Sequence, residues 1–195
     1  MKELFTGIKR KSKRELAKRN YEINSKCDRD PLTATENLIV NDQNGKRGES
    51  FVYGDYPASH NACEAIAVHN ARVLLGQTST LTDTIALFQD LGAMIFRGFF
   101  GSNVYRIGRV LKSLGMRYRK VKLKRMTLPG IYIISFWNKR PLKNGLHTVT
   151  VVYDGKKYVT YNLFGNGVAG REDPKNYAKK FIVGYYLEES GQMNS

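Results

Sequence analysis

One stretch of the sequence decides the fold: Ser59-His60-Asn61-Ala62-Cys63-Glu64-Ala65-Ile66-Ala67-Val68-His69-Asn70-Ala71-Arg72-Val73-Leu74-Leu75-Gly76. Residues 62–75 contain no proline or glycine, and their small and apolar side chains cover more than one face of a helix with 3.6 residues per turn. The pattern therefore predicts a mostly buried helix over residues 62–75, which Gly76 ends. Polar residues lead into this helix, and a cysteine stands at its beginning.

The position of Cys63 has a chemical consequence. The first backbone N–H groups of a helix have no acceptors within the helix, and the positive end of the helix dipole favours anions. A thiol at that place ionises more readily than a thiol elsewhere. Two interpretations remain open at this point, because a buried cysteine is also a small core residue. Cys63 is either a nucleophile or part of the core.

Length and composition indicate one globular domain with extensions. The chain has 195 residues, of which 42% are hydrophobic and 11% aromatic, and this composition excludes a mainly disordered chain. The length suffices for one well-buried core and is short for two. We expect a basic N-terminal extension at 1–35, a folded domain at 36–188 and a C-terminal tail at 189–195.

The charge balance points to an anionic partner. The chain carries 32 Lys and Arg against 17 Asp and Glu, a formal net charge of +15, which attracts nucleic acid, an anionic membrane surface or an acidic protein. Residues 1–20 are rich in Lys and Arg and predict a peripheral helix or arm for an acidic partner or anionic surface, or a solubilising tail. Residues 116–125 interleave basic and apolar residues, which suits either a phosphate backbone or a solvated outer strand.

Several classes of protein find no support in the sequence. No apolar run approaches the roughly 18 residues of a membrane span, and no apolar segment follows the basic start as in a secretory signal, so we expect a cytoplasmic protein. Cys27 and Cys63 are too few for a disulfide framework, although one bridge between them stays open. With three histidines and no Cys-x-x-Cys pair, we expect no metal site and no other cofactor. His69 is expected to be a core or surface histidine.

The remaining elements predict an α+β fold. Thr80 caps a second helix that runs to about residue 91, and Ser102 or Asn103 caps a third helix that ends before Gly115. Residues 21–50 read as a loop with one short strand at 38–40. Strands are predicted at 116–123, 131–137, 146–153, 157–163 and 181–187. Helices followed by strands indicate an antiparallel sheet packed against the helices.

A hairpin signal predicts a partner for one histidine. Asp154-Gly155 is a typical two-residue turn, and it would pair the strand residues so that His147 lies opposite Asn162. Directly opposed residues place their side chains on the same face, with Cβ atoms roughly 5 Å apart. A nucleophilic cysteine needs an imidazole to take its proton and a third group to orient that imidazole. Cys63, His147 and Asn162 supply these three residue types, and a four-residue loop would break the pairing.

The three pieces that carry these residues resemble a known family. They are Asn61-Ala62-Cys63-Glu64-Ala65-Ile66-Ala67, Gly145-Leu146-His147-Thr148-Val149-Thr150-Val151-Val152-Tyr153 and Val159-Thr160-Tyr161-Asn162. In order and setting they resemble the papain-like cysteine peptidases, and more closely the small bacterial peptidases that cut double-glycine leader peptides from bacteriocins.

The resemblance implies a papain-like fold and a peptide or protein substrate. It also implies hydrolysis of a peptide or related amide bond through a thioester. Cys63 would be the nucleophile, His147 the general base and acid, and Asn162 the orienting residue.

The sequence departs from the family beside the cysteine. The family usually has Gly after its cysteine, where this chain has Glu64, and Gln about six residues before it, where this chain has Pro57. Asn61 is the nearest amide that could replace this oxyanion donor, together with the backbone N–H of Cys63, and Gln43 is a more distant one. The loop 98–103, with Gly101, is expected to border the cleft. Two other functions stay open: a non-catalytic peptide-binding or partner-binding module on the same fold, and a basic nucleic-acid-binding domain.

Overall fold

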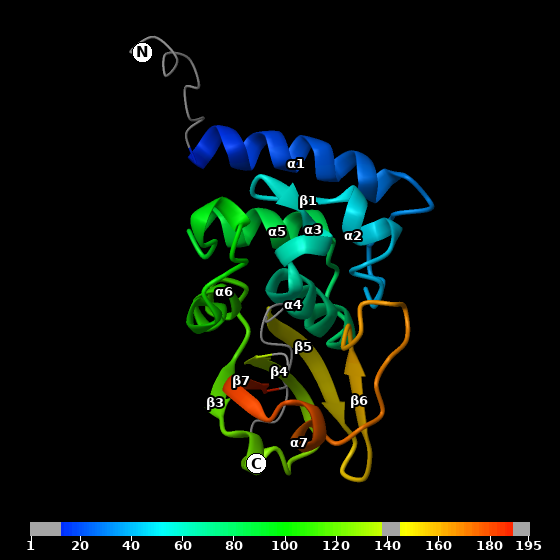
Figure 1. The fold of residues 1–195 in the computed structure, drawn as a ribbon, viewed down its shortest axis with the longest axis vertical. Helices are drawn as coiled ribbons and strands as arrows, with labels where there is room; N and C mark the ends of the chain where they lie inside the picture. Colours follow the sequence, from blue (N-terminus) through cyan, green and yellow to red (C-terminus); the bar gives the residue numbers. More distant parts are fainter. Residues whose placement is uncertain (1–12, 138–144, 189–195) are drawn as a thin grey trace, which may run out of the picture.

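The computed structural model describes residues 13–137 and 145–188 (Figure 1). The helices are α1 (Lys13–Arg29), α2 (Lys46–Ser50), α3 (Ala58–Asn61), α4 (Cys63–Leu74), α5 (Leu81–Asp90), α6 (Ile107–Ser113) and α7 (Pro174–Tyr177), with single 3₁₀ turns η1 (Phe96–Gly98), η2 (Val104–Arg106) and η3 (Leu123–Arg125). The strands are β1 (Val52–Tyr53), β2 (Tyr56–Pro57), β3 (Tyr118–Val121), β4 (Gly130–Trp137), β5 (Leu146–Tyr153), β6 (Tyr158–Tyr161) and β7 (Lys180–Leu187).

The fold is α+β, as the sequence predicts. Five strands form an antiparallel sheet in the order β3-β7-β4-β5-β6, and β1 and β2 form a separate two-stranded ribbon. Helix α4 packs against β5 and β4, and its other side faces α5. Figure 1 shows the helical half at one end of the molecule and the sheet at the other, with α4 between them.

Helix α4 is buried along most of its length, as its apolar pattern predicts. Every residue from Cys63 to Ala71 is buried, and the helix ends before Gly76, whose φ of +70° suits a glycine. The hydroxyl of Thr150 on β5 donates to the carbonyl oxygen of Ala67 at 2.7 Å. This bond joins the helix that begins at Cys63 to the strand that carries His147.

The other two predicted helices are also present. The Thr80 side chain accepts a hydrogen bond from the Asp83 N–H at 3.1 Å and caps α5. Asn103 accepts from the Tyr105 N–H at 3.0 Å and begins the turn η2, which α6 follows directly. Both caps are the residues that the sequence predicts.

The prediction for residues 21–50 is wrong in two respects. Helix α1 extends to Arg29, and a short helix α2 forms at Lys46–Ser50. Residues 38–40 do not form a strand. The reason is that Val40 bonds to a side chain of α4: its N–H donates to Asn70 Oδ1 at 2.8 Å and its carbonyl accepts from Asn70 Nδ2 at 2.9 Å. Asn70 thereby replaces a neighbouring strand.

The expected N-terminal extension contains a helix that packs on the rest of the chain. In α1, Leu16 is buried, and the Asn20 amide donates to Gly54 O at 2.6 Å and to Gln89 Oε1 at 2.8 Å. Helix α1 therefore lies against α5 and β1 as part of the helical layer. The expected basic arm at 1–12 and the tail at 189–195 lie outside the described residues, so their anionic or acidic partner stays a prediction.

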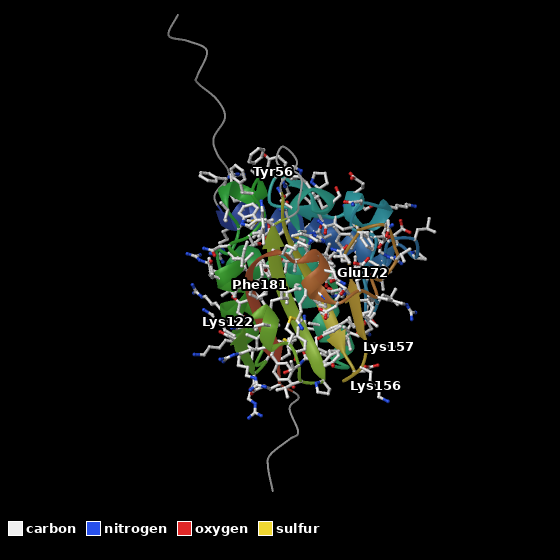
Figure 2. All side chains as sticks on the ribbon, turned by 60° about the horizontal axis from the view of Figure 1, so that its bottom comes forward. Tyr56, Lys122, Lys156, Lys157, Glu172 and Phe181 are labelled. Atoms are coloured by element: carbon white, nitrogen blue, oxygen red, sulfur yellow. The ribbon has the colours of Figure 1, made fainter. Side chains whose placement is uncertain are left out.

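Basic side chains lie at the outer strands and turns. Strand β3 is an edge of the sheet, with Arg119 and Lys120 exposed, as expected of a solvated outer strand. Figure 2 shows Lys122, Lys156 and Lys157 projecting at the surface. The nucleic-acid interpretation of residues 116–125 stays a prediction. None of the helices in the described ranges has the length and hydropathy that crossing a bilayer requires.

Candidate active site

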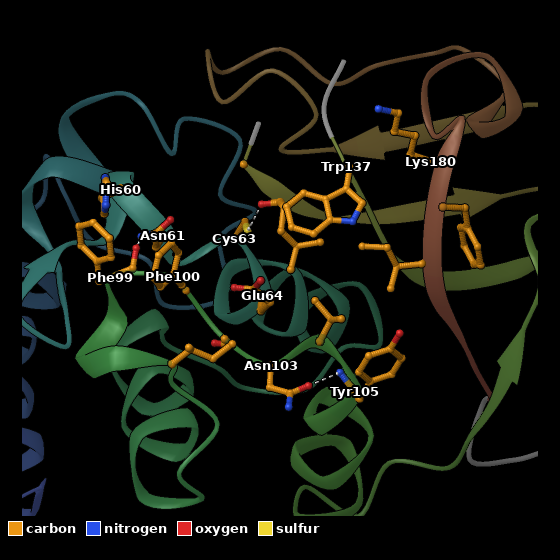
Figure 3. A pocket seen from close by; sticks show the side chains of 18 residues that line it. His60, Asn61, Cys63, Glu64, Phe99, Phe100, Asn103, Tyr105, Trp137 and Lys180 are labelled. Carbon is orange, nitrogen blue, oxygen red and sulfur yellow. Dashed lines mark hydrogen bonds between the residues drawn. The ribbon is translucent and has the colours of Figure 1, made fainter. Parts of the chain in front are cut away.

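Cys63 is the first residue of α4 and lies where two cavities meet. The helix start has no side-chain cap, and the cysteine is buried, with its sulfur 3.8 Å from the carbonyl oxygen of Leu146. One cavity of about 200 Å³ is lined by both Cys63 and His147, and another of about 1000 Å³ is lined by Cys63 and Glu64 (Figure 3). The uncapped helix start therefore presents the sulfur to two spaces at once.

The predicted register of the hairpin that carries His147 is wrong. Tyr153 pairs with Tyr158 and Thr150 with Tyr161, so the loop has four residues, 154–157, instead of two. The physical reason is the side chain of Asp154, whose Oδ1 accepts from the Lys156 N–H at 2.7 Å and the Lys157 N–H at 2.6 Å. A shift of two residues leaves every side chain on its predicted face.

The structure still joins His147 to Asn162, through a different group. His147 Nε2 lies 2.8 Å from the backbone carbonyl oxygen of Asn162, not from its carboxamide. A carbonyl only accepts hydrogen bonds, so this contact places the proton on Nε2 and leaves Nδ1 as the basic nitrogen of the neutral ring. Burial lowers the pKa of His147, which favours this neutral form.

Asn162 can offer its carbonyl because its backbone leaves the strand. Its φ is +62°, a value that favours Asn or Gly, and its N–H donates to Asn41 Oδ1 at 2.6 Å. The side-chain Nδ2 donates to Gln43 Oε1 at 2.7 Å, while Oδ1 is buried without a partner in the described structure. The side chain therefore anchors the turn, and the main chain orients the imidazole.

The separate roles of the Asn162 side chain and main chain predict the effect of Asn162→Gly. We expect Cys63 in this variant to react with iodoacetamide within about threefold of the unmodified rate, because glycine keeps both the carbonyl and the positive φ. Loss of the bond to Gln43 is expected to lower the free energy of unfolding by about 1 kcal/mol. Rates of alkylation followed by mass spectrometry check this. A loss on the order of a hundredfold would show that the carboxamide itself supports the general base.

The two amides predicted as oxyanion donors are both engaged elsewhere. Gln43 lies in the smaller cavity with Cys63, but its Nε2 donates to Ala58 O at 3.3 Å and to Ser59 O at 3.2 Å. Asn61 Nδ2 donates to Gly98 O at 3.0 Å and also to the carbonyl of Phe99. Neither amide points its N–H groups at the sulfur in this arrangement.

The larger cavity combines aromatic walls with a buried carboxyl group. Glu64, one residue after Cys63, is only 1% exposed and lies directly beside it (Figure 3). The aromatic residues that line the cavity are Phe99, Phe100, Tyr105, Trp137 and Phe181. Gly101, predicted at the cleft, also lines this cavity, and a Cβ placed on it would stand 3.3 Å from Glu64 Oε2. The predicted cleft loop 98–103 contains Phe99 and Phe100. The sequence contains no local signal for Tyr105, Trp137 and Phe181, because they come from three further segments.

The thiol is neutral at rest. Burial raises the pKa of Cys63 well above its ordinary value, the charge of Glu64 raises it further, and hydrogen bonding from Thr148 lowers it. Together with the lowered pKa of His147, this predicts a neutral thiol and a neutral imidazole rather than a preformed ion pair. Proton transfer to the imidazole would then accompany the attack of the sulfur.

The other histidines and the second cysteine are separate from this chemistry. His69 is a core residue, bonded to Ser79 Oγ at 3.0 Å and Leu38 O at 2.8 Å. His60 lines both cavities and contacts the rings of Tyr56 and Phe99. Cys27 and Cys63 are both free thiols. Within residues 13–137 and 145–188, no three His, Cys, Asp or Glu side chains are grouped as they would be to hold a metal ion.

The fold and site described above place a cysteine at a helix start beside an antiparallel sheet that carries a histidine. A scan against protein-family models found no match, and a search of curated proteins found none either. A search of solved structures found similarity to the peptidase domain of Streptococcus ComA, a bifunctional ABC transporter involved in a quorum-sensing pathway. The identity is 14% and the TM-score 0.49, over 66% of this chain and 91% of that domain.

Proposed function

We propose that this protein is a papain-like thiol hydrolase that cleaves a peptide or related amide bond through a thioester on Cys63. One observation carries the proposal. Cys63 begins an uncapped, buried helix and shares a cavity with His147, whose proton is held on Nε2 by the Asn162 carbonyl. A nucleophile, a base and an orienting group in that order are what nucleophilic catalysis by cysteine requires.

The chemistry follows from the protonation states. His147 Nδ1 takes the proton of the thiol while the sulfur attacks the carbonyl carbon of the substrate. His147 then gives this proton to the leaving nitrogen as the carbon–nitrogen bond breaks, and the acyl group stays on the sulfur. A water molecule, deprotonated by the same nitrogen, attacks the thioester and restores the thiol. An amine in place of water would give acyl transfer by the same steps.

The two cavities on either side of the sulfur support a chain-like substrate. A bound peptide or protein segment that places its scissile bond at Cys63 extends into both, with one part in the larger, aromatic cavity and the other in the smaller, polar one. Peptide and protein substrates have the length to occupy both spaces.

A non-catalytic binding module is the second candidate. The observation in its favour is that the Cys63 sulfur bonds to the Leu146 carbonyl, and that no hydrogen bond joins it to the His147 ring in the described structure. A thiol with a raised pKa and two engaged amides also suits a cleft that binds without cutting.

An activated ester distinguishes these candidates. With p-nitrophenyl acetate near pH 7.5, we expect a burst of nitrophenol equal in amount to the enzyme, and an acetyl group on Cys63 in mass spectra of the intact protein. Cys27→Ser is the matched control: it removes the other thiol and should leave the burst unchanged. The burst should vanish in Cys63→Ala. A folded Cys27→Ser protein without a burst would refute the hydrolase and favour the binding module.

A further inference from the structure

Glu64 lines the cleft and has no role in the steps above. It carries a buried carboxyl group beside the sulfur, and its Oε2 has no hydrogen-bond partner among the described residues. Buried polar atoms without partners are rare in native proteins and call for an explanation. Gly101 leaves space beside this oxygen because it has no side chain. A Cβ at position 101 would stand 3.3 Å from Glu64 Oε2.

In the described structure, neither of the two amides predicted as a second donor for a developing oxyanion is directed at the sulfur. The backbone N–H of Cys63, at the uncapped helix start, is one donor. Gln43 and Asn61 are side-chain amides that line the cavities at Cys63, and both donate to main-chain carbonyls instead. A tetrahedral intermediate held by one donor alone would lose on the order of a hundredfold in rate.

At neutral pH the Glu64 carboxyl can donate a hydrogen bond. Burial raises its pKa to about 8, even though hydrogen bonds from its own N–H, the Cys63 thiol and the Ser102 backbone act in the other direction. Below that pH the group is mostly protonated and carries an O–H, as a carboxylic acid does in an apolar site. It lies in the wall of the larger cavity, one residue beyond the nucleophile.

We propose that the neutral carboxyl group of Glu64 donates the second hydrogen bond to the oxyanion that forms when Cys63 attacks a carbonyl group. This inference rests on the proposed function, because it concerns the same reaction. When the carbon–sulfur bond forms, the π electrons of the carbonyl move to its oxygen, and Glu64 donates its O–H to that oxygen without transferring the proton. The hydrogen bond is released when the carbonyl re-forms and the leaving group departs.

The role depends on pH in a defined direction. Above about pH 8 the carboxyl ionises, loses its donor and becomes a negative charge facing the oxyanion. The titratable groups around it are Cys63 beside it, Tyr53, which is buried and interacts with its charge, and, along the same cavity, His60, Tyr105 and Lys180. Glu64 raises the pKa of both Cys63 and Tyr53, so these two stay protonated while it ionises.

Two reagents separate oxyanion stabilisation from thiol reactivity. p-Nitrophenyl acetate reacts through a tetrahedral oxyanion, whereas iodoacetamide alkylates the same sulfur by displacing iodide and forms no oxyanion. In the Cys27→Ser background, Glu64→Ala should slow acylation by about a hundredfold and leave alkylation within about threefold. Glu64→Gln is the matched variant, because its amide keeps a donor of the same shape. It should keep acylation within about tenfold.

The ratio of acylation to alkylation rates gives the pH test. In the unmodified site the ratio should fall above about pH 8, and in Glu64→Gln it should stay level, because the amide does not ionise. The inference is overturned if Glu64→Ala slows both reactions equally, if it slows neither, or if Glu64→Gln behaves like Glu64→Ala. If one of these outcomes occurred together with a normal burst, only the role of Glu64 would be overturned and the hydrolase proposal would remain. Absence of any burst in the unmodified site would overturn both proposals.

Discussion

His147→Ala is expected to slow the acylation of Cys63 by p-nitrophenyl acetate about a thousandfold at pH 7.5. Removing a general base costs between roughly a hundredfold and ten thousandfold, and here the cost is large because the thiol does not ionise alone. Burial holds the pKa of Cys63 well above neutral pH, so without the imidazole almost no thiolate forms. The loss should shrink as the pH rises, since hydroxide can then remove the proton.

His60→Ala is the matched control for this experiment. His60 also lines both cavities, but it is exposed and its ring contacts Tyr56 and Phe99. We expect less than a tenfold change in the acylation rate, because no hydrogen bond to a main-chain carbonyl sets its tautomer. Equal losses in both variants would show that a ring in the cleft matters only for its shape. An undiminished rate in His147→Ala would remove the proposed base.

The helices and strands were predictable because their signals are local. The helix at Cys63 follows from fourteen residues without glycine or proline between polar residues and Gly76. The cap at Thr80 and the β-branched residues of β5 likewise need only their own neighbours in sequence. These elements place Cys63 and His147 on the helix and strand that the sequence indicates.

Features that depend on a distant partner were not predictable. Residues 38–40 have the composition of a strand, but Asn70, thirty residues after Val40, supplies both hydrogen bonds of the Val40 backbone. The four-residue hairpin depends on whether the Asp154 carboxylate turns back to two N–H groups, which a dipeptide signal does not specify. In both cases hydrogen bonds from a polar side chain to the main chain replace the regular strand or turn pattern that the sequence predicts.

In the candidate site, the sequence likewise predicts which residues take part but not which of their atoms make the contacts. The sequence identifies Cys63, His147 and Asn162 as a group, yet the contact to the imidazole comes from the Asn162 carbonyl. It names Gln43 and Asn61 as donors, yet Gln43 donates to a main-chain carbonyl of α3 and Asn61 to one of η1. Residue types suggest what chemistry a cleft could perform, whereas backbone conformation, here a φ of +62°, decides which atom performs it.

Gly48→Ala is expected to lower the free energy of unfolding by about 3 kcal/mol, at the upper end of overpacking effects. From the sequence alone the opposite sign would be expected, because alanine in a helix is favoured over glycine by about 1 kcal/mol. The structure reverses the sign. A Cβ on Gly48 in α2 would stand 1.6 Å from the backbone oxygen of Gln43, so the main chain at Gln43 has to move.

That movement reaches the candidate site through one chain of contacts. Gln43 holds the Asn162 side chain at 2.7 Å, and the Asn162 carbonyl holds His147 at 2.8 Å. Because Asn162→Gly loses the same bond to Gln43, acylation in the folded Gly48→Ala variant should be no slower than in Asn162→Gly, which unfolding curves in urea and burst kinetics together measure. Gly145→Ala is the control for stability, because no described residue lies within 4 Å of its added Cβ. If Gly48→Ala proved as stable as Gly145→Ala, α2 would not pack on Gln43 as described, and the support of Asn162 by Gln43 would lose its structural basis.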